Sequence, residues 1–249
     1  MAFPRFALPR FALPRFALPR FAPLRAAALL VAAIVLPATL AAAATPRANW
    51  LAMSAVTPEG GHRLGNPDAA IKLVEWVSYT CPHCATFQKQ AETPLRMAYV
   101  NSGKVSVEVR HLVRDPVDLA ATVLANCGSP ANFWRLHNAF LIGQDRWIVK
   151  MASASDAQKA RWSNGGFSAR MRAIAADFGF YAIMEQRGYP RAAVDRCLAD
   201  EAAARRLAGH REAAAAAGVD GTPSFLLNGL LLTGTHDWQS LELQIKARL

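Results

Sequence analysis

Acidic residues are missing from the start of this 249-residue chain. The first 58 residues contain no Asp or Glu but six arginines, five of which recur at every fifth position. The chain has only four cysteines, too few for a disulfide-rich scaffold. It has no Walker loop and no Gly-x-Gly-x-x-Gly turn, so neither nucleotide-binding motif is present. With 53% apolar and 18% charged residues, the chain is long and apolar enough to bury a core.

The amino-terminal arginines belong to a repeat of the unit Phe-Ala-Leu-Pro-Arg, which spans residues 6–20. A proline in every unit excludes a stable helix, so we interpret the repeat as low complexity without structure. An apolar run over 26–36 and four alanines at 41–44 follow. This order predicts a signal peptide over residues 1–44, cleaved after about Ala44. An uncleaved membrane anchor is the alternative, because residues 26–44 approach spanning length.

Half of the net charge of +10 lies in this leader. Without residues 1–44 the chain has 23 basic and 18 acidic residues, a net charge of +5. We therefore interpret the leader arginines as export charges and expect no nucleic-acid partner. The signal peptide predicts a periplasmic location, where cysteines can persist as disulfides.

Hydrophobic patterns organise the rest of the chain. Residues 45–65, rich in Pro and Gly, predict an extended lead-in. Strands are predicted over 70–79 and 105–112, and between them a helix over 84–100 that Pro94 should kink. About 100 residues of helical signals follow, then a hairpin at Asn228-Gly229 and a last helix. We predict an α/β domain over 66–113 and 218–249, with an inserted helical domain over 114–217.

The sequence Cys81-Pro82-His83-Cys84 follows a buried strand directly and opens a helix. Cys81 at the helix amino terminus would have a stabilised thiolate, because unpaired N–H groups and the helix dipole favour negative charge there. Pro82 fits the first helical turn, and His83 can add positive charge or a hydrogen bond. Cys84, one turn deeper, is expected to be the buried, resolving sulfur. This spacing predicts a redox-active dithiol whose disulfide is oxidising.

Zinc binding and a purely structural pair are the alternatives to a redox dithiol. One Cys-x-x-Cys supplies two ligands, whereas a structural zinc site needs four, and the sequence has no second such motif. We expect no metal.

Glu75 is unusual because it lies in the middle of the predicted apolar strand. It could face solvent by strand alternation. Alternatively, it is buried beneath the dithiol, where a raised pKa would let it exchange a proton with Cys84.

Two segments of the sequence are similar to a known family. Residues 73–84, Leu-Val-Glu-Trp-Val-Ser-Tyr-Thr-Cys-Pro-His-Cys, resemble the DsbA family of thiol:disulfide oxidoreductases, as do residues 218–225, Gly-Val-Asp-Gly-Thr-Pro-Ser-Phe. The resemblance covers about residues 60–249 and implies a thioredoxin-like fold with an inserted helical domain. It also implies that the Thr222–Pro223 bond is cis, lies beside Cys81 and contacts substrate. Thr222 stands where the best-known member has Val, which leaves the redox poise open.

Cys127 and Cys197 both lie in the helical block. In an exported protein we expect them to form a structural disulfide, with two separately buried thiols as the alternative. His111, His137 and His210 lack metal-ligand spacing, and we interpret them as surface or hydrogen-bonded histidines.

Three functions are compatible with the sequence. The leading hypothesis is a monomeric periplasmic oxidase without cofactor, which donates the Cys81–Cys84 disulfide to newly exported cysteine-containing proteins. A membrane quinone-linked partner would reoxidise it. The second is an isomerase or reductase on the same fold, although residues 45–65 are too short for the dimerisation domain of known isomerases. The third is a non-catalytic peptide-binding chaperone module, against which the intact Cys-x-x-Cys argues.

Overall fold

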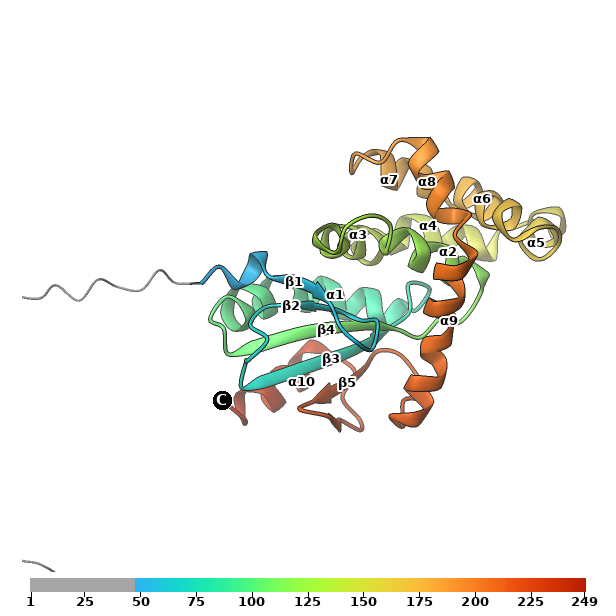
Figure 1. The fold of residues 1–249 in the computed structure, drawn as a ribbon. Coiled ribbons are helices and arrows are strands. Elements are labelled where there is room, and N and C mark those ends of the chain that lie inside the picture. The colour runs from blue at the N-terminus through green and yellow to red at the C-terminus, as the bar shows by residue number, and fades with distance from the viewer. Residues whose placement is uncertain (1–47) are drawn as a thin grey trace, which may run out of the picture. The chain divides into compact units, whose positions relative to one another are not determined.

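The structure is a computed structural model that describes residues 48–249. The repeat and the predicted signal peptide over 1–44 lie outside the described residues. Within them, six strands form one sheet in the order β1-β2-β4-β3-β5-β6 (Figure 1). No helix among these residues combines the length and the apolar character that a membrane crossing requires.

From β3 onward the strands and helices follow the predicted order. The strands are β1 (Ser54–Val56), β2 (His62–Leu64), β3 (Ile71–Val77), β4 (Val105–His111), β5 (Ser224–Leu227) and β6 (Leu230–Leu231). The helices of the α/β part are the short η1 (Trp50–Ala52), α1 (Pro82–Pro94), η2 (Leu95–Val100) and α10 (Trp238–Lys246). The helical insertion consists of α2 (Pro116–Ala125), α3 (Pro130–Ile142), α4 (Gln144–Ala152), α5 (Asp156–Ser163), α6 (Phe167–Phe178), α7 (Phe180–Glu185), α8 (Arg191–Leu198) and α9 (Glu201–Ala216).

The two faces of β3 pack against different helices. Leu73 and Val77 belong to the main core with residues of α1 and α10, whereas Trp76 packs with Ala214 of α9 on the other face. Because successive strand residues alternate between faces, Glu75 lies on the α1 side with Leu73 and Val77. β3 pairs in parallel with β4 and antiparallel with β5, which is the pairing of a thioredoxin-like sheet.

The described part of the segment before residue 66, predicted as an extended lead-in, contains the short 3₁₀ helix η1 and two strands of the sheet, β1 and β2. β1 and β2 pair antiparallel, and β2 pairs with β4. The Thr57 hydroxyl in the turn between them donates to Glu108 of β4 at 2.7 Å. Three-residue strands beside Pro58 and Gly60 are too short to show an alternating pattern, so the sequence did not reveal them.

Pro94 changes the helix as its position suggests. The ring has no N–H and crowds the preceding turn, so regular α-helical bonding cannot continue through it. α1 ends at Pro94, where the Leu95 N–H is shared between the Ala91 and Glu92 carbonyls, and the chain continues in the wider π-type turns of η2, with the Asn101 N–H bonded to the Arg96 carbonyl. The predicted kink is therefore a change of hydrogen-bonding pattern.

The helical insertion lies between β4 and β5 in sequence. Figure 1 shows α2–α8 gathered on one side of the sheet and α9 running back towards β5. One core continues from sheet residues such as Phe225 into insertion residues such as Phe140 and Phe178. The insertion therefore shares its core with the α/β part and does not pack as an independent unit.

Candidate active site

The dithiol lies between the end of β3 and the start of α1. Cys81 has an extended backbone conformation at the N-cap of α1, and Pro82 occupies the first helical position. Cys84 is fully buried, and both cysteines are free thiols in the structure. The Cys81 thiol donates to the Thr222 carbonyl at 3.1 Å. The sulfur of Cys81 is thus held between the start of a helix and the loop before β5.

The pKa values of the two thiols are shifted in opposite directions. The hydrogen bond from the Cys84 thiol is the main reason that the pKa of Cys81 falls to about 5, against the opposing effect of burial. The backbone N–H groups of Cys84 and His83 lower this pKa further. Burial raises the pKa of Cys84 well above the usual range of a thiol. At neutral pH the reduced pair therefore holds one thiolate, on Cys81.

Glu75 is buried beneath the dithiol, only 2% exposed. One of its oxygens, Oε1, has no hydrogen-bond partner among the described residues. Burial, with a smaller effect of the Glu92 charge, raises the pKa of Glu75 to about 8. A small cavity of about 20 Å³, lined among others by Glu75, Gln88 and Glu92, has room for one water molecule. The solvent-facing alternative for Glu75 is therefore wrong, because α1 covers its side of the sheet.

The loop before β5 completes the site. The Thr222–Pro223 peptide bond is cis, as the family resemblance implies, and the Thr222 carbonyl contacts Cys81. Thr222 Oγ1 is buried and has no hydrogen-bond partner in the described part of the chain. A groove of about 1150 Å³ opens here, and its walls include Cys81, the exposed His83 and residues 218–222. Pro82 is also exposed at the rim of this groove.

Two carboxylates at the start of α2 hold the segment before Cys81. Asp118 is fully buried and accepts hydrogen bonds from the Ser78 hydroxyl at 2.6 Å and the Tyr79 N–H at 2.8 Å. Asp115, the N-cap of α2, accepts from the Thr80 hydroxyl at 2.7 Å. Neither was identified from the sequence, although Asp115-Pro116 is a typical helix start and Asp118 is a lone charge in an apolar helix.

Gln144 at the start of α4 is a third positioning residue that the sequence did not indicate. Its side-chain amide donates to the Tyr79 carbonyl at 2.6 Å and to the Cys81 carbonyl at 2.9 Å. A glutamine at a helix start carries no distinctive signal, so no sequence pattern could have identified it. The insertion thus fixes the backbone on which the reactive sulfur is mounted.

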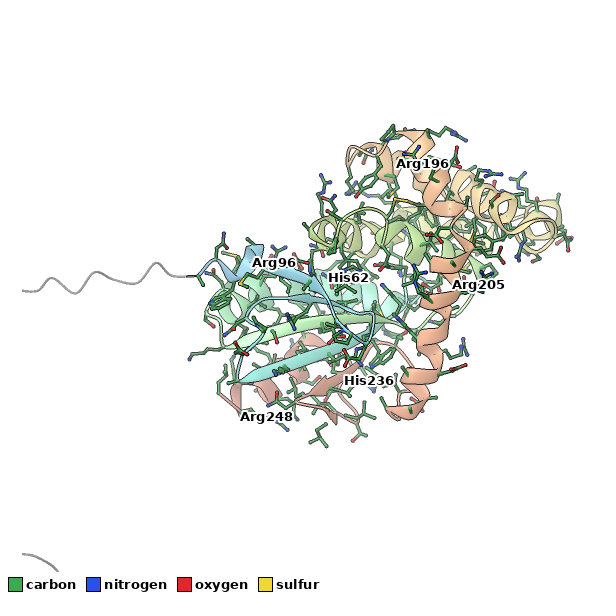
Figure 2. All side chains as sticks on the ribbon, in the orientation of Figure 1. His62, Arg96, Arg196, Arg205, His236 and Arg248 are labelled. Atoms are coloured by element: carbon green, nitrogen blue, oxygen red, sulfur yellow. A yellow bond between two sulfur atoms is a disulfide. The ribbon has the colours of Figure 1, made fainter. Side chains whose placement is uncertain are left out.

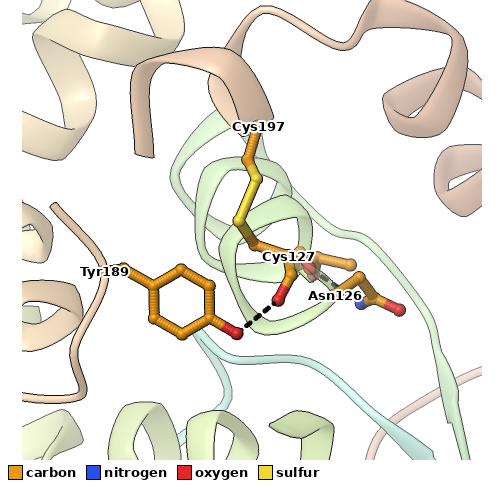
Figure 3. Close-up of a disulfide and its surroundings, with 5 residues drawn as sticks. Asn126, Cys127, Tyr189 and Cys197 are labelled. Carbon is orange, nitrogen blue, oxygen red and sulfur yellow. Dashed lines mark hydrogen bonds between the residues drawn. A yellow bond between two sulfur atoms is a disulfide. The ribbon is translucent and has the colours of Figure 1, made fainter. Parts of the chain in front are cut away.

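Cys127 and Cys197 form a disulfide within the insertion, with their Cα atoms 5.8 Å apart (Figure 3). It joins the segment after α2 to α8, and the Tyr189 hydroxyl donates to the Cys127 carbonyl at 2.9 Å. This is the pairing expected from the sequence. The disulfide is distant in sequence from the Cys81–Cys84 pair. Among the described residues, no hydrogen bond joins the two pairs of cysteines.

Three histidines gather between the sheet and the insertion, where Figure 2 shows His62. His62 stacks on Phe133, and His137 contacts the Tyr79 hydroxyl through Nδ1 at 3.0 Å. Asn126 bridges His62 and His111, at 2.7 Å and 3.1 Å. His111 and His137 are thus core residues, not surface ones, and each keeps one ring nitrogen that has no hydrogen-bond partner among residues 48–249. In residues 48–249 no group of three metal-binding side chains is arranged to hold an ion.

The fold and the site together define a thioredoxin-like dithiol protein with a helical insertion. The thioredoxin family model matches residues 57–247. The chain therefore belongs to the thioredoxin family, and its insertion between β4 and β5 is the arrangement of the DsbA-type members.

Individual relatives agree with this assignment. A protein-disulfide isomerase from Novosphingobium aromaticivorans is 49% identical, with a TM-score of 0.73 over 76% of this chain and 97% of that one. Alpha-DsbA1 of Wolbachia pipientis shares the fold, with a TM-score of 0.57 over 77% of this chain and 91% of that one, at 19% identity.

Curated relatives are longer than this chain. A Rickettsia conorii protein named as a protein-disulfide oxidoreductase is 29% identical over 188 residues, which are 75% of this chain and 59% of that one. The chain thus spans less than two thirds of the curated relatives that it matches first.

Proposed function

We propose that this protein is a thiol:disulfide oxidoreductase that oxidises the cysteines of newly exported proteins. The observation that carries the proposal is the difference between Cys81, with a pKa of about 5, and Cys84, whose pKa is well raised. A stabilised Cys81 thiolate favours the reduced enzyme, so the Cys81–Cys84 disulfide is a strong oxidant.

The reaction begins with the oxidised enzyme. A substrate thiolate attacks Cys81 Sγ, the Cys81–Cys84 bond breaks, and Cys84 leaves with the electron pair. Because its thiolate is buried and costly, Cys84 takes up a proton. Glu75, with a pKa of about 8, is protonated at neutral pH, and its charge would act on Cys84, so we assign it the supply of that proton.

The second exchange releases the product. A second substrate thiolate attacks the substrate sulfur of the mixed disulfide, and Cys81 leaves as the thiolate. Its low pKa makes Cys81 a good leaving group. The substrate has then lost two electrons and two protons, and the enzyme dithiol has gained the electrons.

The groove supports binding of an extended substrate segment. The backbone beside the cis-Pro223 is adjacent to Cys81 and can pair with a substrate strand, while exposed His83 and Pro82 border the entry. Recognition through main-chain atoms suits a catalyst that accepts many sequences. We propose that the protein acts in the periplasm as a monomer, after removal of residues 1–44, and that a membrane quinone-linked partner reoxidises it.

An isomerase is the second candidate, because the relative at 49% identity is called a protein-disulfide isomerase. The two functions differ in the redox state that works. An oxidase introduces disulfides into a reduced client while it is itself oxidised, whereas an isomerase rearranges a scrambled client while it is reduced.

The deciding experiment measures the redox equilibrium of Cys81–Cys84 against glutathione, together with both client assays. An oxidising potential and activity on the reduced client, lost in Cys81→Ser, would support the oxidase. A strongly reducing value, or activity only on the scrambled client, would contradict it. Client binding and function retained after both cysteines are changed to Ala would instead favour a chaperone module.

A further inference from the structure

A second cavity lies in the helical insertion, apart from the dithiol. It has a volume of about 500 Å³ and is formed by α3, α4, α7 and the end of α6. None of its lining residues also lines the groove at Cys81. Its size is within the range of pockets that hold small organic ligands.

The rim of this cavity carries charge of one sign. Arg135, Arg146, Lys150 and Arg187 line it, and no Asp or Glu does. None of the four forms a salt bridge within the described residues, where seven other ion pairs are present. Four uncompensated cations around one hollow favour an anionic ligand.

Two of these cations are held in place by backbone carbonyls. Arg135 donates to the Arg187 carbonyl at 3.0 Å, and Arg187 donates to the Ile183 carbonyl at 3.1 Å. The guanidinium groups are thus fixed without a carboxylate to neutralise them. Burial, and then the charge of Arg135, lowers the pKa of Arg187, which is the effect of a cation without a compensating partner.

Part of the cavity lining is apolar, beside the polar side chains of Asn138 and Gln186. Ile142, which is 42% exposed, and the half-buried Ile183 present apolar surface to the cavity, whereas Trp147 and Phe178 are almost fully buried. A ligand that fits must therefore present a negative head to the rim and a hydrocarbon part to the interior. Arginine suits such a head, because its planar donors match a carboxylate or phosphate.

We propose that this cavity binds a monomeric amphiphilic anion, with its carboxylate or phosphate head on the four cations and its apolar tail along Ile142 and Ile183. This assignment does not depend on the redox function.

Calorimetric titration of the full chain tests the assignment with soluble probes. We expect decanoate and decyl phosphate to bind and decanol and inorganic phosphate to bind on the order of tenfold more weakly or not at all, because each lacks one half of the recognition. Vesicles of phosphatidylglycerol form the comparison arm. Binding to vesicles without binding of monomeric decanoate would overturn the proposal, because it would indicate a surface patch and not a pocket.

Charge reversal locates the bound probe. Arg146→Glu/Lys150→Glu changes two exposed rim residues whose side chains make no hydrogen bond in the described structure, and it should weaken decanoate on the order of tenfold. Lys104→Glu/Lys159→Glu, two exposed cations outside the cavity, makes the same change in net charge and should leave the affinity unaltered. An equal loss of decanoate affinity in both double variants would show nonspecific electrostatic attraction and would overturn the assignment.

Discussion

Cys81 and Cys84 are chemically identical side chains, and their surroundings make one acidic and the other not. The helix start presents N–H groups to Cys81, and Cys84 donates its thiol hydrogen to the same sulfur. Cys84 itself is enclosed by the core, where burial outweighs the donors that could stabilise a charge. The sequence predicted the direction of this asymmetry from the position of Cys81 at the helix start, whereas its largest causes, the hydrogen bond from Cys84 and the burial of Cys84, are set by the folded site.

The acidity of Cys81 should depend on the hydrogen that Cys84 donates. We expect the thiolate absorbance of reduced enzyme to titrate with a midpoint near pH 5. Cys84→Ala removes the donor and should raise the pKa of Cys81, whereas Cys84→Ser keeps a hydroxyl donor and should raise it less. Ultraviolet titration of the three proteins measures this. Equal midpoints in both variants would show that the Cys84 hydrogen bond is not the main cause.

Glu75 should lower the stability of the fold at neutral and alkaline pH. Its pKa in the folded protein, about 8, exceeds its ordinary 4.5, so the folded state holds the proton more tightly. Stability due to the protonated carboxyl is therefore complete below pH 4.5 and is lost as pH rises through 8, at roughly 1.4 kcal/mol per pH unit. Urea denaturation should show that the free energy of unfolding of Glu75→Gln rises relative to that of wild type as pH increases from 4.5 to 8. Glu212→Gln, at an exposed position, is the control and should show no such trend.

At the scale of elements, the insertion positions the reactive segment. The first turn of α2 supplies Asp115 and Asp118, and the start of α4 supplies Gln144, all bonded to residues 78–81. These elements lie 34 or more positions along the chain from Cys81, so hydrophobic periodicity revealed the helices but not which loop they hold. The same limit applied to β1 and β2, whose pairing with β4 only the fold reveals.

Removing the Asp118 carboxylate should destabilise the fold strongly. Asp118→Ala removes the acceptor of the Ser78 hydroxyl and leaves the buried Tyr79 N–H and the Arg114 N–H without their partner, which should cost about 3 kcal/mol in the free energy of unfolding. Asp118→Asn keeps one acceptor oxygen and should cost less. Urea denaturation compares both variants with Asp156→Ala, a change at an exposed helix start. This control should lower the free energy of unfolding by only a few tenths of a kcal/mol. If Asp118→Ala lowered the free energy of unfolding no more than this control does, Asp118 would not hold the segment before Cys81.

At the scale of the whole molecule, the disulfide fastens the insertion across 70 residues of chain. Removing it in Cys127→Ala/Cys197→Ala should lower the free energy of unfolding by about 4 kcal/mol in the chain-entropy model. Thiol titration of denatured, unreduced Cys81→Ser/Cys84→Ser checks the pairing directly and should find no free thiol. Two thiols per chain would refute it.

The buried histidines give the whole molecule a weakness towards acid. Burial lowers the pKa of His137 to about 3 and that of His111 well below its ordinary 6.5. Their contribution to stability is therefore present above pH 6.5 and is lost as pH falls towards 3. His137→Gln, which cannot titrate but keeps a hydrogen-bonding group for Tyr79, should lose less stability than wild type between pH 6.5 and 4. Glu75 and Asp118 have raised pKa values and the opposite slope, so the test is the difference between the two proteins, and parallel curves would contradict it.

Sequence patterns alone predicted the dithiol, its order of reactivity, the order of most elements and the pairing of Cys127 with Cys197. These follow from cysteine spacing, a helix start and hydrophobic period, which are properties of short segments or of composition. Only the folded chain shows that Glu75 faces α1, that Asp118 and Gln144 hold the loop, and that the histidines meet in the core. Each of these depends on contacts between segments far apart in the chain, where the free energy of burial and the available hydrogen-bond partners are set by the packing of the whole fold.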